Sequence, residues 1–366
     1  MTIRFSGATV FDGQKFLDDP VLHPAGQPAE PQHIELDGGW ILPGLVDLQV
    51  NGGDGIMIGG QTSAADLARI CATHARLGAV SILPTLITDS PAATRAVLKA
   101  GAEATRAAVP GFLGLHLEGP HLDPRRKGAH DPALIRPMSD ADLNLICEAR
   151  SDLPALMVTL APEAADARQI ATLAAAGVLV SLGHSDCGYD AAAAAFAAGA
   201  SGVTHLFNAM SQLTTREPGL VGAALDLAPA IGLIADGFHV HPAAIRIAMA
   251  AAGGRIHLVS DAMAPAGTRL DAFDLNGRRI LRRDGRLTLE DGTLAGADLT
   301  LPQAIATMIG AGVAPEIAFA MATSRPARAI GRDDIGHLRA GARADFIHLG
   351  PDLSLRAVWQ AGRRIL

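Results

Sequence analysis

The chain has 366 residues, of which 49% are hydrophobic and 18% are charged, so it can bury a core as large as a barrel of roughly 250 residues with an accessory module. The formal net charge is -7, and no basic tract or aromatic-interleaved patch indicates a nucleic-acid surface. No apolar stretch reaches the roughly 18 residues of a membrane span and no signal peptide is recognisable, so we expect no membrane association.

Cys71, Cys147 and Cys187 lie far apart and do not form a CxxC pair. A disulfide framework is therefore not expected, and this cysteine usage favours a cytoplasmic location.

Both ends of the chain have the pattern of short β-strands. The candidates are residues 2–5, 8–11 and 33–36 near the N-terminus, and residues 344–349, 356–360 and 363–366 near the C-terminus. We therefore predict a small β-sandwich domain built from residues 1–40 and 336–366, with residues 41–335 inserted between its two halves.

Within the inserted segment, strand-like and helix-like stretches alternate. The eight candidate strands are rich in Val, Ile and Leu without clean alternation, as expected for strands buried on both faces; they are residues 41–48, 79–85, 112–117, 155–160, 178–182, 202–205, 230–235 and 255–260. Between them, Ser90 and Ser139 have the pattern of helix N-caps, and the Ala-rich runs favour helices. We predict an α/β fold with a (β/α)8 TIM barrel. A doubly wound sheet is the competing architecture, but no Gly-rich phosphate fingerprint follows the first strand.

Polar side chains recur just past these strands, where a parallel barrel carries its chemistry. Moving along the chain, these residues are Asp47, Gln49, Asn51, Glu118, His184, His205, Asp236, His239 and Asp261. Every one of them is expected at the same mouth of the barrel.

Three of these residues are the types that hold a catalytic metal. Glu118, His184 and His205 supply one carboxylate and two imidazoles, and three protein ligands leave an open position for water. Asp261 is then placed to act as general base for that water and later as acid for the leaving group. Taken singly, each His is more often a hydrogen-bonded loop residue, and Glu118 could instead pair with a nearby basic residue. Their recurrence at equivalent strand ends favours the metal site.

Several motifs resemble the amidohydrolase superfamily and, within it, the N-acetylglucosamine-6-phosphate deacetylase family. They include HLEGPHLDPRRKGAHD (116–131), GHSD (183–186), THLFNAMSQLTTREPGL (204–220), ADGFHVHP (235–242) and SDAMAPAG (260–267). The resemblance implies hydrolysis of the acetamide of N-acetyl-D-glucosamine 6-phosphate to D-glucosamine 6-phosphate and acetate, in amino-sugar catabolism or recycling.

The resemblance also implies roles for the loop residues. His130 matches a catalytic residue close to the acyl carbonyl, and Arg216 and His239 match phosphate-binding positions, the arginine reaching the neighbouring active site of a homodimer. The implied substrate-binding set is Gln49, Asn51, Ala129, Asn208, Ala209, Arg216, Asp236, Gly237, His239, Leu294, Ala295 and Gly296. The alternative for Arg216 is a surface salt bridge with Glu217.

One departure from the superfamily concerns the number of metals. Many amidohydrolases carry His-x-His after the first strand to hold a second metal, but this chain has Gln49 and Asn51 there. Neutral amides are poor ligands for transition metals, so we expect one divalent cation per subunit. Zinc suits the ligand set, and iron, cobalt and manganese remain open.

Two alternative functions stand beside this one, and only the second belongs to a different class of protein. One is another amidohydrolase, such as a D-amino-acid deacylase or an imide hydrolase, which would not obviously require Arg216 and His239. The other is a catalytically inactive barrel used as an assembly scaffold, against which the complete set of three ligands and Asp261 argues.

Overall fold

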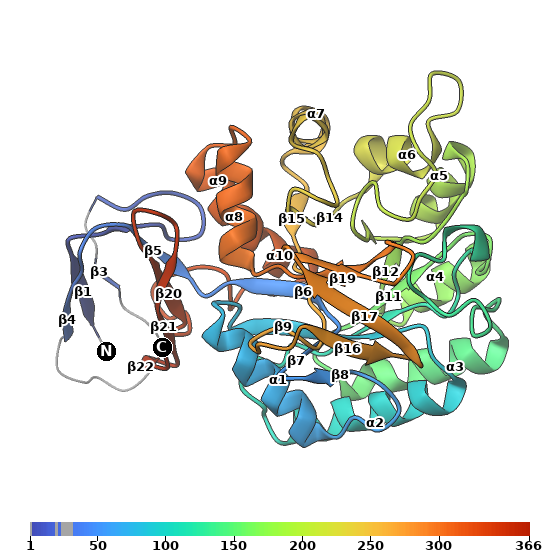
Figure 1. Cartoon of the computed structure of the whole chain (residues 1–366), viewed down its shortest axis with the longest axis horizontal. Helices are drawn as coiled ribbons and strands as arrows, with labels where there is room; N and C mark the ends of the chain where they lie inside the picture. The colour runs from blue at the N-terminus through green and yellow to red at the C-terminus, as the bar shows by residue number, and fades with distance from the viewer. Residues whose placement is uncertain (1, 19–20, 23–31) are drawn as a thin grey trace.

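The computed structural model describes residues 2–18, 21–22 and 32–366, and it has an eight-stranded parallel barrel at its centre (Figure 1). Neighbouring strands follow the order β15-β14-β13-β12-β11-β10-β9-β6. They are β6 (Val46–Val50), β9 (Ser81–Ile87), β10 (Leu115–Glu118), β11 (Leu156–Leu160), β12 (Leu179–Leu182), β13 (Gly202–Val203), β14 (Ile231–Leu233) and β15 (Ile256–Leu258).

The barrel is nearly closed. The carboxyl end of the first strand, β6, meets the segment that follows the last strand, β15: Asp261 N donates to Gln49 O at 3.0 Å, and Asn51 N donates to Ala262 O at 2.8 Å. The predicted α/β barrel is thus confirmed, with its strands in the predicted order.

The first predicted strand, residues 41–48, is wrong as a single element. It divides into β5 (Trp40–Pro43), which belongs to a terminal sheet, and β6, which belongs to the barrel. The break falls at Gly44, whose backbone N donates to Asp345 O. A Cβ at Gly44 would lie 2.1 Å from Cγ2 of Val80, so only glycine allows the chain to pass this close to its neighbour.

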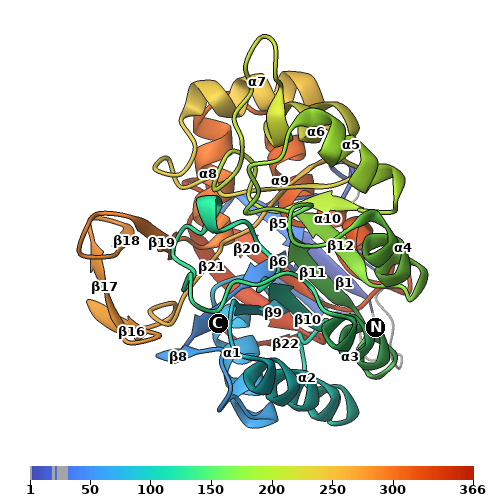
Figure 2. The same cartoon turned by 90° about the vertical axis from the view of Figure 1, so that its right-hand side faces the viewer.

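Helices cover the outside of the barrel (Figure 2). They are α1 (Ala64–Arg76), α2 (Pro91–Arg106), α3 (Asp140–Ala149), α4 (Ala167–Ala175), α5 (Tyr189–Ala197), α6 (Gly219–Leu227), α7 (Pro242–Ala252), α8 (Leu301–Gly310), α9 (Pro315–Ala322) and α10 (Ser324–Ala329), with the short 3-10 helices η1 (Pro124–Arg126) and η2 (Arg150–Asp152). Both predicted N-caps are present: Ser90 accepts from Ala93 N, and Ser139 forms a capping box with Asp142. No helix in the described part of the chain is long and apolar enough to cross a membrane.

Both ends of the chain meet in two small sheets at one side of the barrel (Figure 1). One has the order β3-β1-β4, from β1 (Ile3–Ser6), β3 (Val21–Leu22) and β4 (Gln32–Glu35). The other has the order β2-β5-β20-β21-β22, from β2 (Thr9–Val10), β5, β20 (Phe346–Leu349), β21 (Leu355–Gln360) and β22 (Arg363–Arg364).

Apolar side chains from the two sheets share one core. Ile3 and Phe5 pack with Phe346 and Trp359, and the rings of Phe346 and Trp359 stack with centroids 4.7 Å apart. The expected pairing of both termini is therefore present, while the domain limits at residues 40 and 336 stay a prediction. Within the predicted N-terminal part, residues 1, 19–20 and 23–31 lie outside the described residues.

A four-stranded antiparallel sheet between β15 and α8 was not predicted. It consists of β16 (Ala272–Leu275), β17 (Arg278–Arg283), β18 (Arg286–Thr288) and β19 (Leu294–Ala297), and in Figure 2 it projects from the barrel in orange. Its small core packs Leu275, Ile280 and Leu287 with Ile87 and Met263 of the barrel. The arginine-rich sequence of β17 hid this sheet, because only one of its six residues is fully buried. A short hairpin, β7 (Gly52–Gly53) and β8 (Ile56–Met57), was also missed.

Candidate active site

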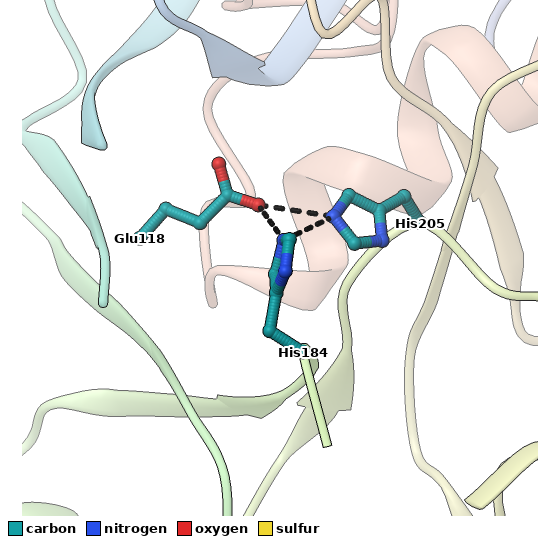
Figure 3. Close-up of side chains that lie close together, drawn as sticks. All are labelled: Glu118, His184 and His205. Carbon is teal, nitrogen blue, oxygen red and sulfur yellow. Dashed lines mark hydrogen bonds and ion pairs between the residues drawn. The ribbon is translucent and has the colours of Figure 1, made fainter. Parts of the chain in front are cut away.

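Glu118, His184 and His205 converge at the mouth of the barrel (Figure 3). Glu118 is the last residue of β10, and each histidine lies two residues past the end of its strand, β12 or β13. Oε1 of Glu118 lies 3.2 Å from Nε2 of His184 and 3.0 Å from Nε2 of His205, and the two nitrogens are 3.1 Å apart. All three residues are buried, so the structure brings together the three predicted metal ligands.

The backbone bends sharply at three site residues. The φ values of His184, His205 and Asp261 are 48°, 33° and 51°, respectively. This left-handed region typically costs a non-glycine residue about 1–3 kcal/mol and persists only where the surrounding fold imposes it. At each of these residues the chain turns away from the direction of the preceding barrel strand. The three side chains meet there, at the carboxyl ends of the strands.

The donor set fits a divalent cation. Nδ1 of His184 lies 2.8 Å from Arg126 O, and because a carbonyl can only accept, Nδ1 carries the proton and Nε2 is left with its lone pair. Ligands about 2.0–2.1 Å from a tetrahedral Zn²⁺ lie roughly 3.3–3.4 Å apart, close to the separations seen here. Nδ1 of His205 is buried without a hydrogen-bond partner among the described residues.

Burial raises the pKa of Glu118, but hydrogen bonds from His184 and His205 outweigh it and hold that pKa well below its usual range. The carboxylate is therefore charged and can share a cation with the two imidazoles.

Asp261 lies beside this group and is buried. Its Oδ1 accepts from Asn51 Nδ2 at 2.6 Å and from Gln49 Nε2 at 3.1 Å, and Gln49 Nε2 also lies 3.0 Å from Glu118 Oε1. Burial and the negative charge of Glu118 raise the pKa of Asp261 to about 7. Gln49 therefore bridges the two carboxylates and Asn51 anchors Asp261. Both amides stand where many amidohydrolases carry the histidines of a His-x-His motif.

His130 is a neutral ring next to His184. Burial lowers its pKa to about 3, and the two ring centroids are 4.4 Å apart. The amide N–H of Thr88 donates to Nδ1 of His130 at 3.3 Å, and the Thr88 hydroxyl lies 2.7 Å from the same atom. Because Nδ1 accepts, the proton of the neutral ring resides on Nε2, which makes His130 a hydrogen-bond donor in the pocket.

These side chains line a pocket of about 780 Å³, counting its solvent-open part. The predicted residues that line it are Asn51, Glu118, Ala129, His130, His184, His205, Asn208, Ala209, His239, Asp261, Leu294 and Gly296. Gln49 and Ala295 are buried behind the surface, and Asp236, Gly237 and Arg216 do not line the pocket.

Sequence reasoning missed the apolar and backbone parts of the lining. These residues are Ile87, Gly128, Ile234, Met263, Leu275 and Thr293. Ile87 ends β9 and Ile234 directly follows β14, so their strand-end positions were a signal that attention to polar residues alone overlooked. Leu275 and Thr293 belong to the unpredicted antiparallel sheet and its loops, and no motif indicated them.

Asp236 acts by holding His239. Its Oδ2 accepts from Nδ1 of the ring at 2.6 Å, and its Oδ1 accepts the backbone N–H groups of Phe238 and His239. Burial alone would raise the pKa of Asp236, but the hydrogen bonds and charge of His239 keep it below its usual value. The pair fixes the ring of His239 at the wall of the pocket.

Arg216 lies in an exposed loop between β13 and α6. Among the described residues it forms no ion pair, so the alternative of a salt bridge with Glu217 is not observed. Glu217 instead accepts the backbone N–H groups of Tyr189 and Gly219. The guanidinium of Arg216 thus remains available to a ligand or to another subunit.

The amidohydrolase family matches residues 40–365 of the chain. An N-acetylgalactosamine-6-phosphate deacetylase from Shewanella sp. (strain ANA-3) is 39% identical over 91% of this chain and 85% of its own length. An N-acetylglucosamine-6-phosphate deacetylase from Haemophilus influenzae is 36% identical over 87% of this chain and 84% of its own. In structure, the chain is similar to N-acetylglucosamine-6-phosphate deacetylase from Pasteurella multocida, with a TM-score of 0.93 and 32% identity over 100% and 99% of the two chains.

Proposed function

We propose that this chain, which belongs to the amidohydrolase family, is a metal-dependent deacetylase of N-acetylated amino-sugar 6-phosphates. The observation that carries the proposal is the convergence of Glu118, His184 and His205 beside Asp261 in one pocket. Relatives named for this activity, which match most of the chain, support it.

The cation would be held by Glu118, His184 and His205. When bound, a dication supplies Lewis acidity that polarises an acyl carbonyl and lowers the pKa of water. We infer one cation per subunit, because Gln49 and Asn51 use their amide nitrogens to donate to the two carboxylates. We infer that this cation is zinc, because one carboxylate and two imidazoles suit it.

Asp261 and His130 have separate roles in the reaction. Asp261, once ionised, accepts a proton from the attacking water and then delivers it to the departing amine nitrogen. The Nε2–H of His130 donates to the oxyanion that develops on the acetamide oxygen, a contribution that is typically about 2.7–4 kcal/mol for one donor. The products are the free amino sugar 6-phosphate and acetate.

The phosphate would be recognised by His239 within the pocket and by Arg216. Because Arg216 does not line the pocket of its own chain, we assign it to the neighbouring active site of a homodimer. A guanidinium offers planar paired donors to phosphate oxygens and supplies the positive charge that an acidic protein otherwise lacks.

We assign N-acetyl-D-glucosamine 6-phosphate as the substrate, on the motifs quoted above. N-acetylgalactosamine 6-phosphate, which differs only in the configuration at C4, is the second candidate. The Shewanella relative favours it, because its identity to this chain exceeds that of the Haemophilus relative.

The test is acetate release by the purified full chain from three compounds: both N-acetylhexosamine 6-phosphates and unphosphorylated N-acetylglucosamine. We expect the highest kcat/KM for N-acetylglucosamine 6-phosphate, a loss of about tenfold or more without the phosphate, and about one metal ion per chain. Faster turnover of the galactosamine compound would transfer the assignment to the second candidate.

No acetate from either phosphate would overturn the proposal. Equal rates with and without the phosphate would favour a different amidohydrolase, such as a D-amino-acid deacylase. Two metal ions per chain would contradict the role given to Gln49 and Asn51.

A further inference from the structure

The loop after β10 encloses His184 from two sides. Arg126 O accepts from Nδ1 of the His184 ring at 2.8 Å, and Asp123 N donates to the backbone carbonyl of His184 at 2.9 Å. At Gly128, a Cβ would lie 3.3 Å from Cε1 of the same ring. Six residues, 123–128, therefore determine both the backbone position and the ring orientation of one metal ligand.

The side chain of Arg126 ties this loop back to the segment that carries His184. Its Nε donates to Oδ1 of Asp186 at 2.7 Å, and its Nη2 lies 2.6 Å from the same oxygen. Asp186 follows His184 by two residues. The contacts thus form a closed ring, from the His184 imidazole to the Arg126 carbonyl, along the Arg126 side chain to Asp186, and back along the chain to His184.

Further contacts hold both halves of this ring in place. Arg125 Nη1 lies 3.1 Å from Oδ2 of Asp186, so the carboxylate contacts two consecutive arginines. On the other side, Glu163 Oε1 accepts the backbone N–H of Asp186 at 2.9 Å, and Glu163 Oε2 accepts the hydroxyl of Ser185 at 2.7 Å. Arg126 and Asp186 are both only partly exposed, at 36% and 27%.

We propose that the ion pair between Arg126 and Asp186 is a positioning pair that sets the metal affinity of the site through His184. The inference rests on the metal role given to His184 above. Partners of a metal-bound histidine's second nitrogen typically change metal affinity about 10–100-fold when they are removed. Here that partner is the backbone carbonyl of Arg126, which cannot be removed by substitution. The ion pair of the Arg126 side chain with Asp186 holds this carbonyl in position.

The test measures the affinity of the full chain for Co²⁺ after chelation of its native metal, by titration against a competing chelator. For Asp186→Ala and Arg126→Met we expect the Kd for Co²⁺ to rise about tenfold, with kcat at saturating Co²⁺ close to that of the unmodified protein. The double variant should bind Co²⁺ no more weakly than Asp186→Ala alone, because Arg126→Met removes an interaction that Asp186→Ala has already removed. Arg126→Lys, which keeps the charge but not the two-nitrogen contact, should lie between.

The matched control is Asp334→Ala. Asp334 pairs with Arg332 through two nitrogens at 2.6 and 2.7 Å, at a comparable exposure of 46% and 27%, but it lies after α10 and contacts no metal ligand. Its loss should leave the Kd for Co²⁺ unchanged.

Unchanged Co²⁺ affinity in both Asp186→Ala and Arg126→Met would overturn the proposal. So would a fall in affinity accompanied by a lower Tm of the metal-free protein, because the pair would then support the fold in general. If the unmodified chain itself binds no Co²⁺, the metal site of the proposed function fails instead, which keeps the two failures distinguishable.

Discussion

The side-chain amide of Asn51 donates a 2.6 Å hydrogen bond to Oδ1 of Asp261. The amide of Gln49 donates to the same oxygen. Oδ2 of Asp261 has no hydrogen-bond partner among the described residues. One carboxylate oxygen is thus anchored and the other is available in a residue that lines the pocket. This is the arrangement that a general base requires, because the anchored oxygen fixes the orientation of the one that accepts the proton.

Replacing Asp261 with asparagine removes the base but keeps a side chain of the same shape. We expect kcat of Asp261→Asn to fall about 10²–10⁴-fold. Metal content should stay the same, since Asp261 is not one of the three converging ligands. Acetate release and metal analysis on the same sample check both parts, with the exposed Asp271→Asn as control. A fully active Asp261→Asn enzyme would remove Asp261 from the mechanism.

The acid limb of the pH profile should report Asp261. Burial and the charge of Glu118 raise its pKa to about 7, and the base works only when ionised, so kcat/KM should fall as the pH drops through this pKa. A bound dication favours the ionised form, so the midpoint with metal should lie below about 7. In Asn51→Ala, a hydrogen bond that stabilises the charged form is lost and the limb should move to higher pH. A limb that stays in place would contradict this assignment.

Arg216→Ala tests the phosphate site. The loss of charge-assisted hydrogen bonds, about 1.5–3 kcal/mol, should lower kcat/KM for the phosphorylated substrate roughly 10–100-fold, mainly through KM. The rate with unphosphorylated N-acetylglucosamine should hardly change. Arg246→Ala, on the exposed side of α7, is the control and should behave like the unmodified enzyme. Equal losses with both substrates would mean that Arg216 does not contact the phosphate.

Asp47 provides a test of stability. It is fully buried, and burial raises its pKa from 3.8 to about 6. The folded chain therefore binds this proton more tightly than the unfolded chain, and the free energy of unfolding falls as the pH rises from 3.8 to 6. Above that range, the ionised carboxylate costs about 3 kcal/mol.

Asp47→Asn removes this titration. Relative to the unmodified protein, the variant should gain about 3 kcal/mol of stability on going from about pH 4 to pH 8. Chemical denaturation at both pH values measures it, and Asp271→Asn, which is exposed, should show no such gain. A pH-independent difference between Asp47→Asn and the unmodified protein would rule out a raised pKa at Asp47.

The strands and the metal ligands were predictable because they depend on short-range patterns. Apolar runs mark buried strands, and the carboxyl ends of parallel strands in a barrel all reach one mouth. Glu118, His184 and His205 could therefore be placed together although 66 and 87 residues separate the carboxylate from the two histidines. The antiparallel sheet β16–β19 was not predictable in this way, since it buries few side chains and gains its small core only by packing on Ile87 and Met263.

By itself, the sequence determined the order of the barrel strands and the residue types that meet at their ends, because each strand's burial is encoded locally in its own side chains. Only the tertiary structure decided how those residues are held. Gln49 bridges to Asp261, and a ring of contacts joins Arg126 to His184 through Asp186. Both sets of contacts connect segments that belong to different strands of the barrel or to the loops that follow them. Hydrogen-bond geometry of this kind depends on distances between backbones far apart in the chain, which no local pattern of residues records.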